Sequence, residues 1–426
     1  MTDTKRGPML LILFAALMAG AGNGITIVAF PWLVLQRNGS AVDASIVAMA
    51  GTLPLLVATL IAGAAVDYLG RRRVSMLSDL LSALSVIAVP VLALMFGVDA
   101  INVAVLAVLA ALGAFFDPAG MTARETMLPE AAGRAGWTLD HANSVYEAVF
   151  NLAYIVGPGI GGLLIATIGG INTMWVTAGA FCCSILAISI LRLEGAGTPD
   201  RSLLTESVWA GIIEGLRFVW HTPVLRTLAI VDLVATGLYM PMESVLFPKY
   251  FTDRNEPTEL GWVLMALSIG GLLGALGYAV LSRPRAVDRA PYMRRRTTML
   301  TAVITLGIAM TVIAFLPPLP LILVLCAVVG FVYGPIAPIY NYVMQTTAPP
   351  HLRGRVVGVM GSLAYAAGPL GLILAGPLAD AVGLHATFLA LSLPMLLLGL
   401  VAVTLPALRE LDRPIPGSSP SADPRS

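Results

Sequence analysis

The sequence predicts an all-α polytopic membrane protein of twelve helices, and two observations lead to this prediction. Of the 426 residues, 58% are hydrophobic and only 12% are charged, whereas soluble domains carry about 25% charged residues. Long apolar runs recur along the whole chain, and about 20 apolar residues are what an α-helix needs to cross a bilayer with its backbone groups satisfied. The first run begins at Met9 and lacks a small-residue cleavage signal, so we expect a retained span.

The distribution of basic residues orients these spans. Only Arg37, Lys249 and Arg254, of 25 lysines and arginines, fall on one side of the membrane. Because cytoplasmic loops are enriched in Lys and Arg, we expect both termini in the cytoplasm and a multi-pass protein of the cell membrane. The net charge of +1 gives no reason to expect a nucleic-acid partner. The predicted spans are 9 to 35, 44 to 66, 74 to 97, 101 to 122, 143 to 168, 171 to 192, 222 to 250, 260 to 281, 296 to 317, 320 to 346, 354 to 380 and 384 to 405.

The longest polar break divides the chain into two six-helix bundles, 1 to 192 and 222 to 405. Within the break, 193 to 221, apolar residues recur on one helical face, which predicts an amphipathic cytoplasmic linker. The end of the chain, 406 to 426, is rich in Pro, Ser and Arg and is predicted to be disordered. The apolar face of the linker would consist of Val208, Ile212, Leu216 and Val219.

The two halves also resemble each other in sequence. Residues 113 to 118 (Gly-Ala-Phe-Phe-Asp-Pro) align with residues 330 to 335 (Gly-Phe-Val-Tyr-Gly-Pro), in equivalent spans four and ten. Repeated halves around a central site near the membrane midplane are the usual build of secondary transporters. The halves are therefore predicted to be pseudo-symmetric.

Cysteines and histidines give no sign of redox or metal chemistry. Cys182, Cys183 and Cys326 all lie in apolar runs, and the four histidines have no ligand spacing. The sequence also has no nucleophile and base pair and no phosphate-binding loop. We therefore expect no metal site, no cofactor and no enzymatic activity.

The loop between spans two and three carries a motif of glycines, an aspartate and arginines. Glycines permit a tight turn, and the carboxylate can accept from a helix N-terminus or an arginine. Three arginines alone would mark only a cytoplasmic turn. The full spacing resembles the signature loop of the major facilitator superfamily, which implies a cytoplasmic gate. The residues are Gly63, Asp67, Gly70, Arg71, Arg72 and Arg73.

Span five contains small residues beside a proline, a combination that favours a close helix approach and a bend. Gly and Pro are common in membrane helices, so the pattern by itself is open to a purely structural interpretation. Within the superfamily it resembles the antiporter motif of drug exporters, which makes export the expected direction. The motif residues are Gly157, Pro158, Gly161 and Gly162.

Three further stretches resemble the macrolide-efflux and enterobactin-exporter group: 30 to 40, 214 to 218 and 354 to 358. The resemblance covers about residues 9 to 405. It implies a proton-coupled antiporter that exports small amphipathic molecules by alternating access. Many drug-proton antiporters carry an arginine within span four, and residues 101 to 121 contain none, so coupling through that arginine is not expected here.

Two spans carry polar stripes. Ionisable groups in a membrane usually face the bundle interior and serve a pathway, because each costs about 2.5 to 3.5 kcal/mol to insert. A stripe that merely pairs with a neighbouring helix is the alternative. The stripe in span seven comprises Asp232, Thr236, Tyr239 and Glu243, and that in span five comprises Asn143, Glu147, Asn151 and Tyr154.

The carboxylates in these stripes are the candidates for proton coupling. Burial without a partner favours the protonated acid, so a deep carboxylate can carry a proton. With a rise of about 1.5 Å per residue, Asp232 lies deepest and ranks first, Glu147 follows, and Glu243 is an outer helper. Asp79 is expected to pair with the basic loop after span two.

The substrate cavity would be lined by polar, aromatic and thioether side chains that adapt to varied ligands. No Lys or Arg is expected deep in any span, which favours neutral or cationic cargo over an anionic siderophore. A siderophore or lipid exporter, or a receptor that transports nothing, are the alternatives. We expect a monomer whose partners are a small amphipathic substrate, protons and membrane lipid. The cavity candidates are Asn23, Asn151, Tyr154, Tyr239, Phe116, Tyr340 and Met344.

Overall fold

The computed structural model describes residues 6–137, 139–193, 208–281, 294–349 and 352–412, and every regular element in these ranges is a helix. Eleven helical stretches among them are long and apolar enough to cross a membrane. The last of these, α14 (Arg353–Thr404), has 52 residues and breaks at Gly383, where φ is 84° and ψ is 167°. Because this break divides α14 into two spans, the prediction of twelve spans is confirmed.

The N-terminal bundle holds six long helices joined by short turns. Several turns contain a glycine at positive φ, among them Gly39 and Gly169. Residues with a Cβ rarely adopt this backbone conformation. Ser40 caps the second helix by accepting from the backbone N–H of Asp43 at 3.2 Å. The helices are α1 (Gly7–Asn38), α2 (Ala41–Leu69), α3 (Arg71–Phe96), α4 (Val103–Ala135), α5 (Leu139–Ile168) and α6 (Gly170–Ile190).

The C-terminal bundle has two interrupted spans. Span seven consists of α8 (Pro223–Pro241), a π-helical segment η2 (Met242–Leu246) and α9 (Phe247–Thr252). Span ten is divided at Gly334-Pro335, where proline removes a backbone donor. The other helices are α10 (Pro257–Leu281), α11 (Arg295–Ile313), α12 (Leu319–Tyr333), α13 (Ile336–Thr347) and α14.

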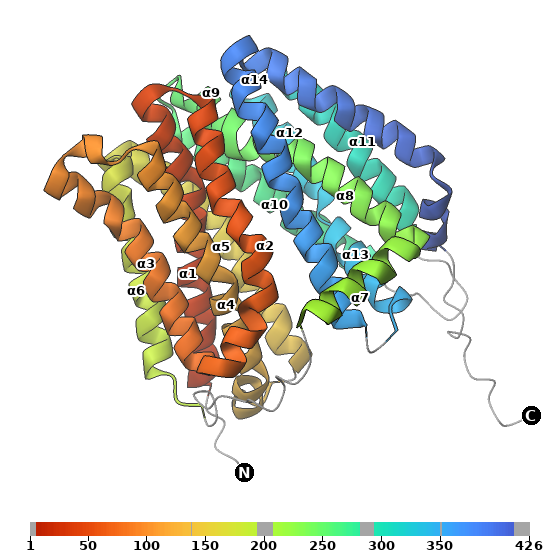
Figure 1. Ribbon diagram of the computed structural model, residues 1–426, viewed down its shortest axis with the longest axis horizontal. Helices are drawn as coiled ribbons and strands as arrows, with labels where there is room; N and C mark the ends of the chain where they lie inside the picture. Colours follow the sequence, from red (N-terminus) through yellow and green to blue (C-terminus); the bar gives the residue numbers. More distant parts are fainter. Residues whose placement is uncertain (1–5, 138, 194–207, 282–293, 350–351, 413–426) are drawn as a thin grey trace, which may run out of the picture.

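The packing pairs repeat between the bundles. Helix α2 packs on α4 as α10 packs on α12, and α1 packs on α5 as α8 packs on α14. The bundles touch each other through α2 with α14 and through α5 with α10. Figure 1 shows that they converge at the edge where α9 and the turn of α14 lie, and splay apart toward the edge where α1 begins and the linker helix lies. We call this second edge, where α1 begins and α14 ends, the terminal face, and the other edge the opposite face.

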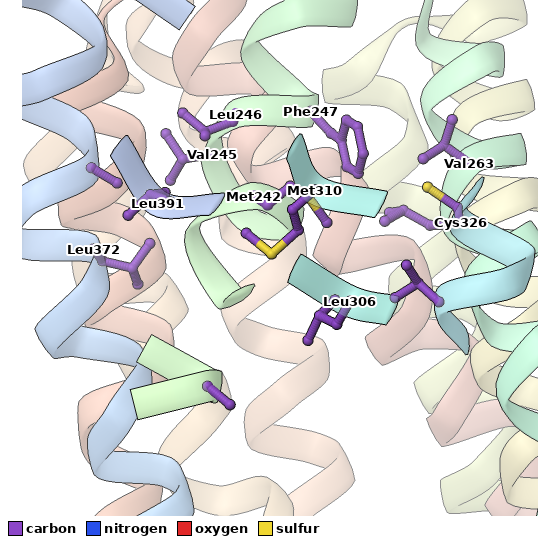
Figure 2. Packing of buried hydrophobic residues seen from close by; sticks show 14 of the residues in the cluster. Met242, Val245, Leu246, Phe247, Val263, Leu306, Met310, Cys326, Leu372 and Leu391 are labelled. Atoms are coloured by element: carbon purple, nitrogen blue, oxygen red, sulfur yellow. The ribbon is translucent and has the colours of Figure 1, made fainter. Parts of the chain in front are cut away.

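Apolar side chains fill the bundles and also cover their outside. In the C-terminal bundle, Met242, Met310 and Cys326 meet aliphatic and aromatic side chains from the neighbouring helices (Figure 2). On the perimeter, large apolar residues such as Leu94 and Ile190 are 78% and 65% exposed. Exposed apolar surface on so many helices fits a lipid environment rather than water.

The linker helix α7 (Val208–His221) lies against α14. Gly215 faces α14, where a Cβ would come within 3.0 Å of the carbonyl oxygen of Arg355. Of the predicted apolar face, Val219 is buried and Leu216 is 44% exposed, and the side chains of Val208 and Ile212 lie outside the described part of the chain. The amphipathic linker stays a prediction.

The chain stays ordered beyond the predicted end of the C-terminal bundle. Residues Pro406–Asp412 form a 3₁₀ helix, η3, that packs on α8 and α11. Leu408 and Leu411 are buried in it. The prediction that disorder begins at residue 406 is therefore wrong for these seven residues, because their two leucines bury enough apolar surface to dock. Residues 413–426 lie outside the described ranges.

Candidate functional site

A cavity of about 730 Å³ lies between the bundles and is lined mainly by helices of the N-terminal bundle. The C-terminal bundle contributes Met240 and Ser244 from span seven and Tyr365 from α14. Most of the wall is apolar or aromatic, as in sites that bind drug-sized ligands. The cavity therefore has the volume and the lining for a small amphipathic molecule.

Polar groups of the cavity gather around one carboxylate. The amide of Asn23 on α1 donates to Oδ1 of Asp117 on α4 at 2.8 Å. Tyr154 on α5 and Glu125, two turns along α4 from Asp117, also line the cavity. Of the predicted cavity residues, Asn23 and Tyr154 are thus present. The carboxylates themselves were missed, although Asp117 stands in the repeated segment 113 to 118, which was a usable signal.

A buried ion pair lies directly behind this site. The guanidinium of Arg124 on α4 lies 3.0 Å from the carboxylate of Asp79 on α3, which also accepts from Ser184 at 2.6 Å. Arg124 and Asp79 are 3% and 1% exposed. The expectation that Asp79 pairs with the basic loop is therefore wrong, and Arg124 lies within α4 although the predicted span ended at residue 122.

Helix α4 is longer than the span predicted from the sequence. The helix continues to Ala135, whereas the predicted span ended at residue 122. At about 1.5 Å per residue, Arg124 lies roughly 30 Å from the start of α4, near the far edge of a hydrocarbon core of about 30 Å. An arginine buried in α4 therefore does exist, although it lies beyond the stretch 101 to 121. Its charge is close enough to act on Asp117.

The polar stripe of span seven faces α12 rather than the cavity. Asp232 and Thr236 both interact with the side chain of Tyr333 on α12. Tyr239 stacks on the same ring, with centroids 6.4 Å apart. Glu243 interacts with Tyr239, and the π-helical segment that contains Glu243 adds a residue to the turn and shifts its direction. The stripe is therefore a ladder of carboxylates and tyrosines within the C-terminal bundle.

The predicted stripe of span five is dispersed. Glu147 and Asn151 are exposed, and the amide of Asn151 donates to the backbone oxygen of Glu147. The side chain of Asn143 lies outside the described part of the chain. Only Tyr154 reaches the cavity.

Three other predicted cavity residues pack elsewhere. Phe116 stacks edge-on against Phe115 at 5.2 Å. Tyr340 donates to the backbone oxygen of Leu228, and Met344 is buried in the apolar core. None of the three is among the residues that line the cavity. Across the described ranges, no three His, Cys, Asp or Glu side chains gather as metal ligands would.

The glycines of the predicted antiporter motif make two contacts. Gly157 and Gly161 lie against α1, where a Cβ on Gly157 would come within 2.8 Å of the Cα of Gly24. Gly162, on another side of α5, lies against α10, where a Cβ would clash with the carbonyl oxygen of Pro257. The glycines thus let α5 approach a helix of its own bundle and a helix of the other bundle.

Part of the predicted gate motif can be located. Gly70 has φ of 85° and separates α2 from α3. Arg71 donates to the backbone oxygen of Thr126 at 2.9 Å, Arg72 donates to carbonyl oxygens at the end of α6, and Arg73 is exposed. The surroundings of Gly63 and of the Asp67 side chain lie outside the described part of the chain. Arg71 and Arg72 thus bind α4 and α6 of their own bundle.

The sequence of this chain is similar to those of known efflux pumps. At 91% identity over 412 residues, the chain matches the multidrug efflux pump Tap of Mycolicibacterium fortuitum, covering 97% of this chain and 99% of the relative. The Tap of Mycobacterium tuberculosis (strain ATCC 25618 / H37Rv) is 68% identical over 97% of this chain and 96% of its own.

Solved structures show the same fold at low sequence identity. A D-xylose-proton symporter superposes with a TM-score of 0.71 at 10% identity, over 96% of this chain and 99% of that one. The Major Facilitator Superfamily model matches residues 12–372 and 293–424. This chain is a multi-pass helical protein with two matched bundles around a cavity, and the family model matches nearly its whole length. It therefore belongs to the Major Facilitator Superfamily.

Proposed function

We propose that this chain exports neutral or cationic amphipathic drugs across the cell membrane in exchange for protons. The observation that carries the proposal is the apolar cavity with the Asp117 carboxylate on its wall. A carboxylate inside a low-dielectric cavity favours a cationic group, while the apolar wall accepts varied shapes. Relatives that are named multidrug efflux pumps at 91% and 68% identity support this function.

The direction of transport follows from orientation. We place the terminal face in the cytoplasm because helices that begin there start with clusters of arginine, at Arg71–Arg73 and Arg294–Arg296. The bundles meet at the opposite face and splay toward the terminal face (Figure 1). In this assignment the conformation is inward-facing and loads cargo from the cytoplasm. Residues 1 to 192 and 222 to 405 would then move against each other as two bodies.

Proton coupling requires a carboxylate that alternates between a proton and another partner. Asp117 can do this directly, because a cationic cargo and a proton compete for the same oxygens. Asp232 is a second carrier: it belongs to the C-terminal bundle and interacts with Tyr333 rather than with the cargo. We rank Glu243 and Glu147 behind these two as proton carriers. For Glu147 the reason is that its side chain is exposed.

The chemistry of the cavity argues against an anionic siderophore as cargo. The described residues that line it include the carboxylates of Asp117 and Glu125 and no lysine or arginine. A catechol or carboxylate cargo would meet only like charge there. The molecule would act as a monomer in contact with lipid, since the two bundles of one chain already enclose the cavity.

The proposal is tested with purified protein in liposomes that hold a fluorescent cationic dye. The solution on the opposite-face side of the membrane is made acidic. Protons that enter from that side should then drive the dye out toward it, and collapsing the gradient with a protonophore should stop the movement. Transport that ignores the pH gradient but follows a sodium gradient would contradict proton antiport. A vesicle without protein is the control for passive leak.

A further inference from the structure

One carboxylate at the opposite face joins the two bundles through three hydrogen bonds. Asp380 lies in the last turn of α14 before the break at Gly383. Its Oδ1 accepts from the backbone N–H of Ala41 at 2.9 Å, and its Oδ2 accepts from the N–H of Val42 and from the hydroxyl of Ser40, both at 3.0 Å. All three donors belong to the first turn of α2 or its cap. An acceptor from one bundle thus caps a helix of the other.

We infer that Asp380 is a latch that holds the opposite face closed and that must release before this face can open. Free N–H groups and the helix dipole at an N-terminus both favour a carboxylate. Because α2 and α14 belong to different bundles, the three hydrogen bonds exist only while the bundles touch at this face. The latch concerns the closure of one face, and it holds whatever the cargo or the coupling ion.

Helix α2 is built to survive release of the latch. The hydroxyl of Ser40 also accepts from the N–H of Asp43 at 3.2 Å, so α2 keeps a cap of its own when Asp380 moves away. Lys249 on α9 acts on Asp380 by its charge, but it forms its own ion pair with Asp253 at 3.0 Å. Release therefore leaves no unpaired charge at the start of α2.

The packing beneath the latch requires the same closeness. Gly376 lies one turn before Asp380 on α14 and faces α2. A Cβ at Gly376 would clash with the hydroxyl of Ser45 and would come within 2.8 Å of the carbonyl oxygen of Ala41. A glycine at this crossing lets the two helices approach closely enough for Asp380 to reach its donors.

The experiment asks whether the cavity becomes reachable from the opposite face. Thr52 on α2 lines the cavity and is 6% exposed, and cysteine is close to it in size. A membrane-impermeant maleimide added outside intact cells should label Thr52→Cys slowly while the latch holds. Asp380→Asn should raise the labelling rate about tenfold, a change that corresponds to about 1.4 kcal/mol, because it removes the negative charge that a helix N-terminus favours and replaces the acceptor Oδ2 with an amide NH2.

A second variant removes a donor and leaves the carboxylate in place. Ala41→Pro lacks the N–H that Oδ1 accepts, and proline is well tolerated at the first helical position. We expect a smaller rise of about threefold, since one of three contacts is lost. Asp99→Asn, a carboxylate of the same face that pairs with Arg37 of its own bundle, is the matched control and should label at the parent rate.

Labelling at the parent rate in both Asp380→Asn and Ala41→Pro would overturn the latch. Equal acceleration in Asp99→Asn would overturn it as well, since the effect would then be general to the face. Because labelling needs no cargo and no gradient, failure of drug export in the unsubstituted protein would contradict the proposed function and leave the latch standing.

Discussion

Replacing Asp117 with asparagine should separate cationic from neutral cargo. The substitution removes the charge but retains a carbonyl oxygen that can accept from Asn23, so the 2.8 Å contact and the shape of the cavity are preserved. The cavity also keeps its apolar wall. The KM for neutral cargo should therefore stay unchanged, whereas cationic cargo loses its counter-charge.

The size of the effect follows from the position of the carboxylate. A cationic group about 4 Å from Asp117 gains about 4 kcal/mol at an effective dielectric constant near 20. Removing water from both charges offsets much of this, and contacts to charged groups retain about 1.5 to 3 kcal/mol. The cavity is partly open to solvent, which favours the lower value. Since 1.4 kcal/mol corresponds to tenfold, KM for a cationic cargo should rise about tenfold.

The assay compares two dyes of similar shape, one with a quaternary ammonium group and one with a neutral substituent. Initial rates of export from liposomes give KM for each dye in the parent protein, in Asp117→Asn and in Asp99→Asn. Asp99 is a fully exposed carboxylate of the opposite face and is the matched control. Equal loss for both dyes in Asp117→Asn, or no loss for either, would refute the role of Asp117 in recognising charge.

Four further outcomes are expected. Asp232→Asn should abolish export driven by a pH gradient while equilibrium binding of a labelled dye persists, and gradient-driven export at the parent rate would remove Asp232 from the mechanism. Asp79→Ala should lower the free energy of unfolding in detergent by about 3 to 5 kcal/mol, because it leaves the Arg124 guanidinium buried without its partner; a loss below about 1 kcal/mol, the range typical of exposed pairs, would contradict this. Gly162→Ala should slow export by clashing with α10, whereas Gly179→Ala, which has nothing within 4 Å of its Cβ, should not, and equal rates in the two variants would refute the close contact. A cysteine at exposed Arg73 should resist an impermeant reagent outside intact cells, and its modification there would reverse the proposed orientation.

The sequence was sufficient for the number of spans and the pairing of the halves. Twenty-residue apolar runs report directly on the solvent around a helix, so composition alone locates them. It was insufficient for the end of α4, because Arg124 and Glu125 look like loop residues until Asp79, 45 positions earlier, is seen to neutralise the arginine. Polarity in a single helix cannot reveal a partner supplied by another.

The faces of the helices were equally hard to foresee. A stripe such as Asp232 to Glu243 follows a regular helical period, yet the π-helical turn after Pro241 changes the period within it. Which side of α8 faces the cavity also depends on how α12 packs, so Asp232 meets Tyr333 while Met240 meets the cavity. By contrast, Asn23 both lines the cavity and forms a hydrogen bond to Asp117 on a neighbouring helix.

The turns at the opposite face are short, which leaves a protease few sites to cut. Between α1 and α2 only residues 39–40 intervene, Gly169 alone separates α5 from α6, and the longest connection, 97–102, is itself partly helical. Proteases cut extended, exposed loop tips, and this face offers almost none. Enzymes added to intact cells should therefore leave the chain whole, and an inserted epitope tag would be better tolerated in 97–102 than at the single-residue turns.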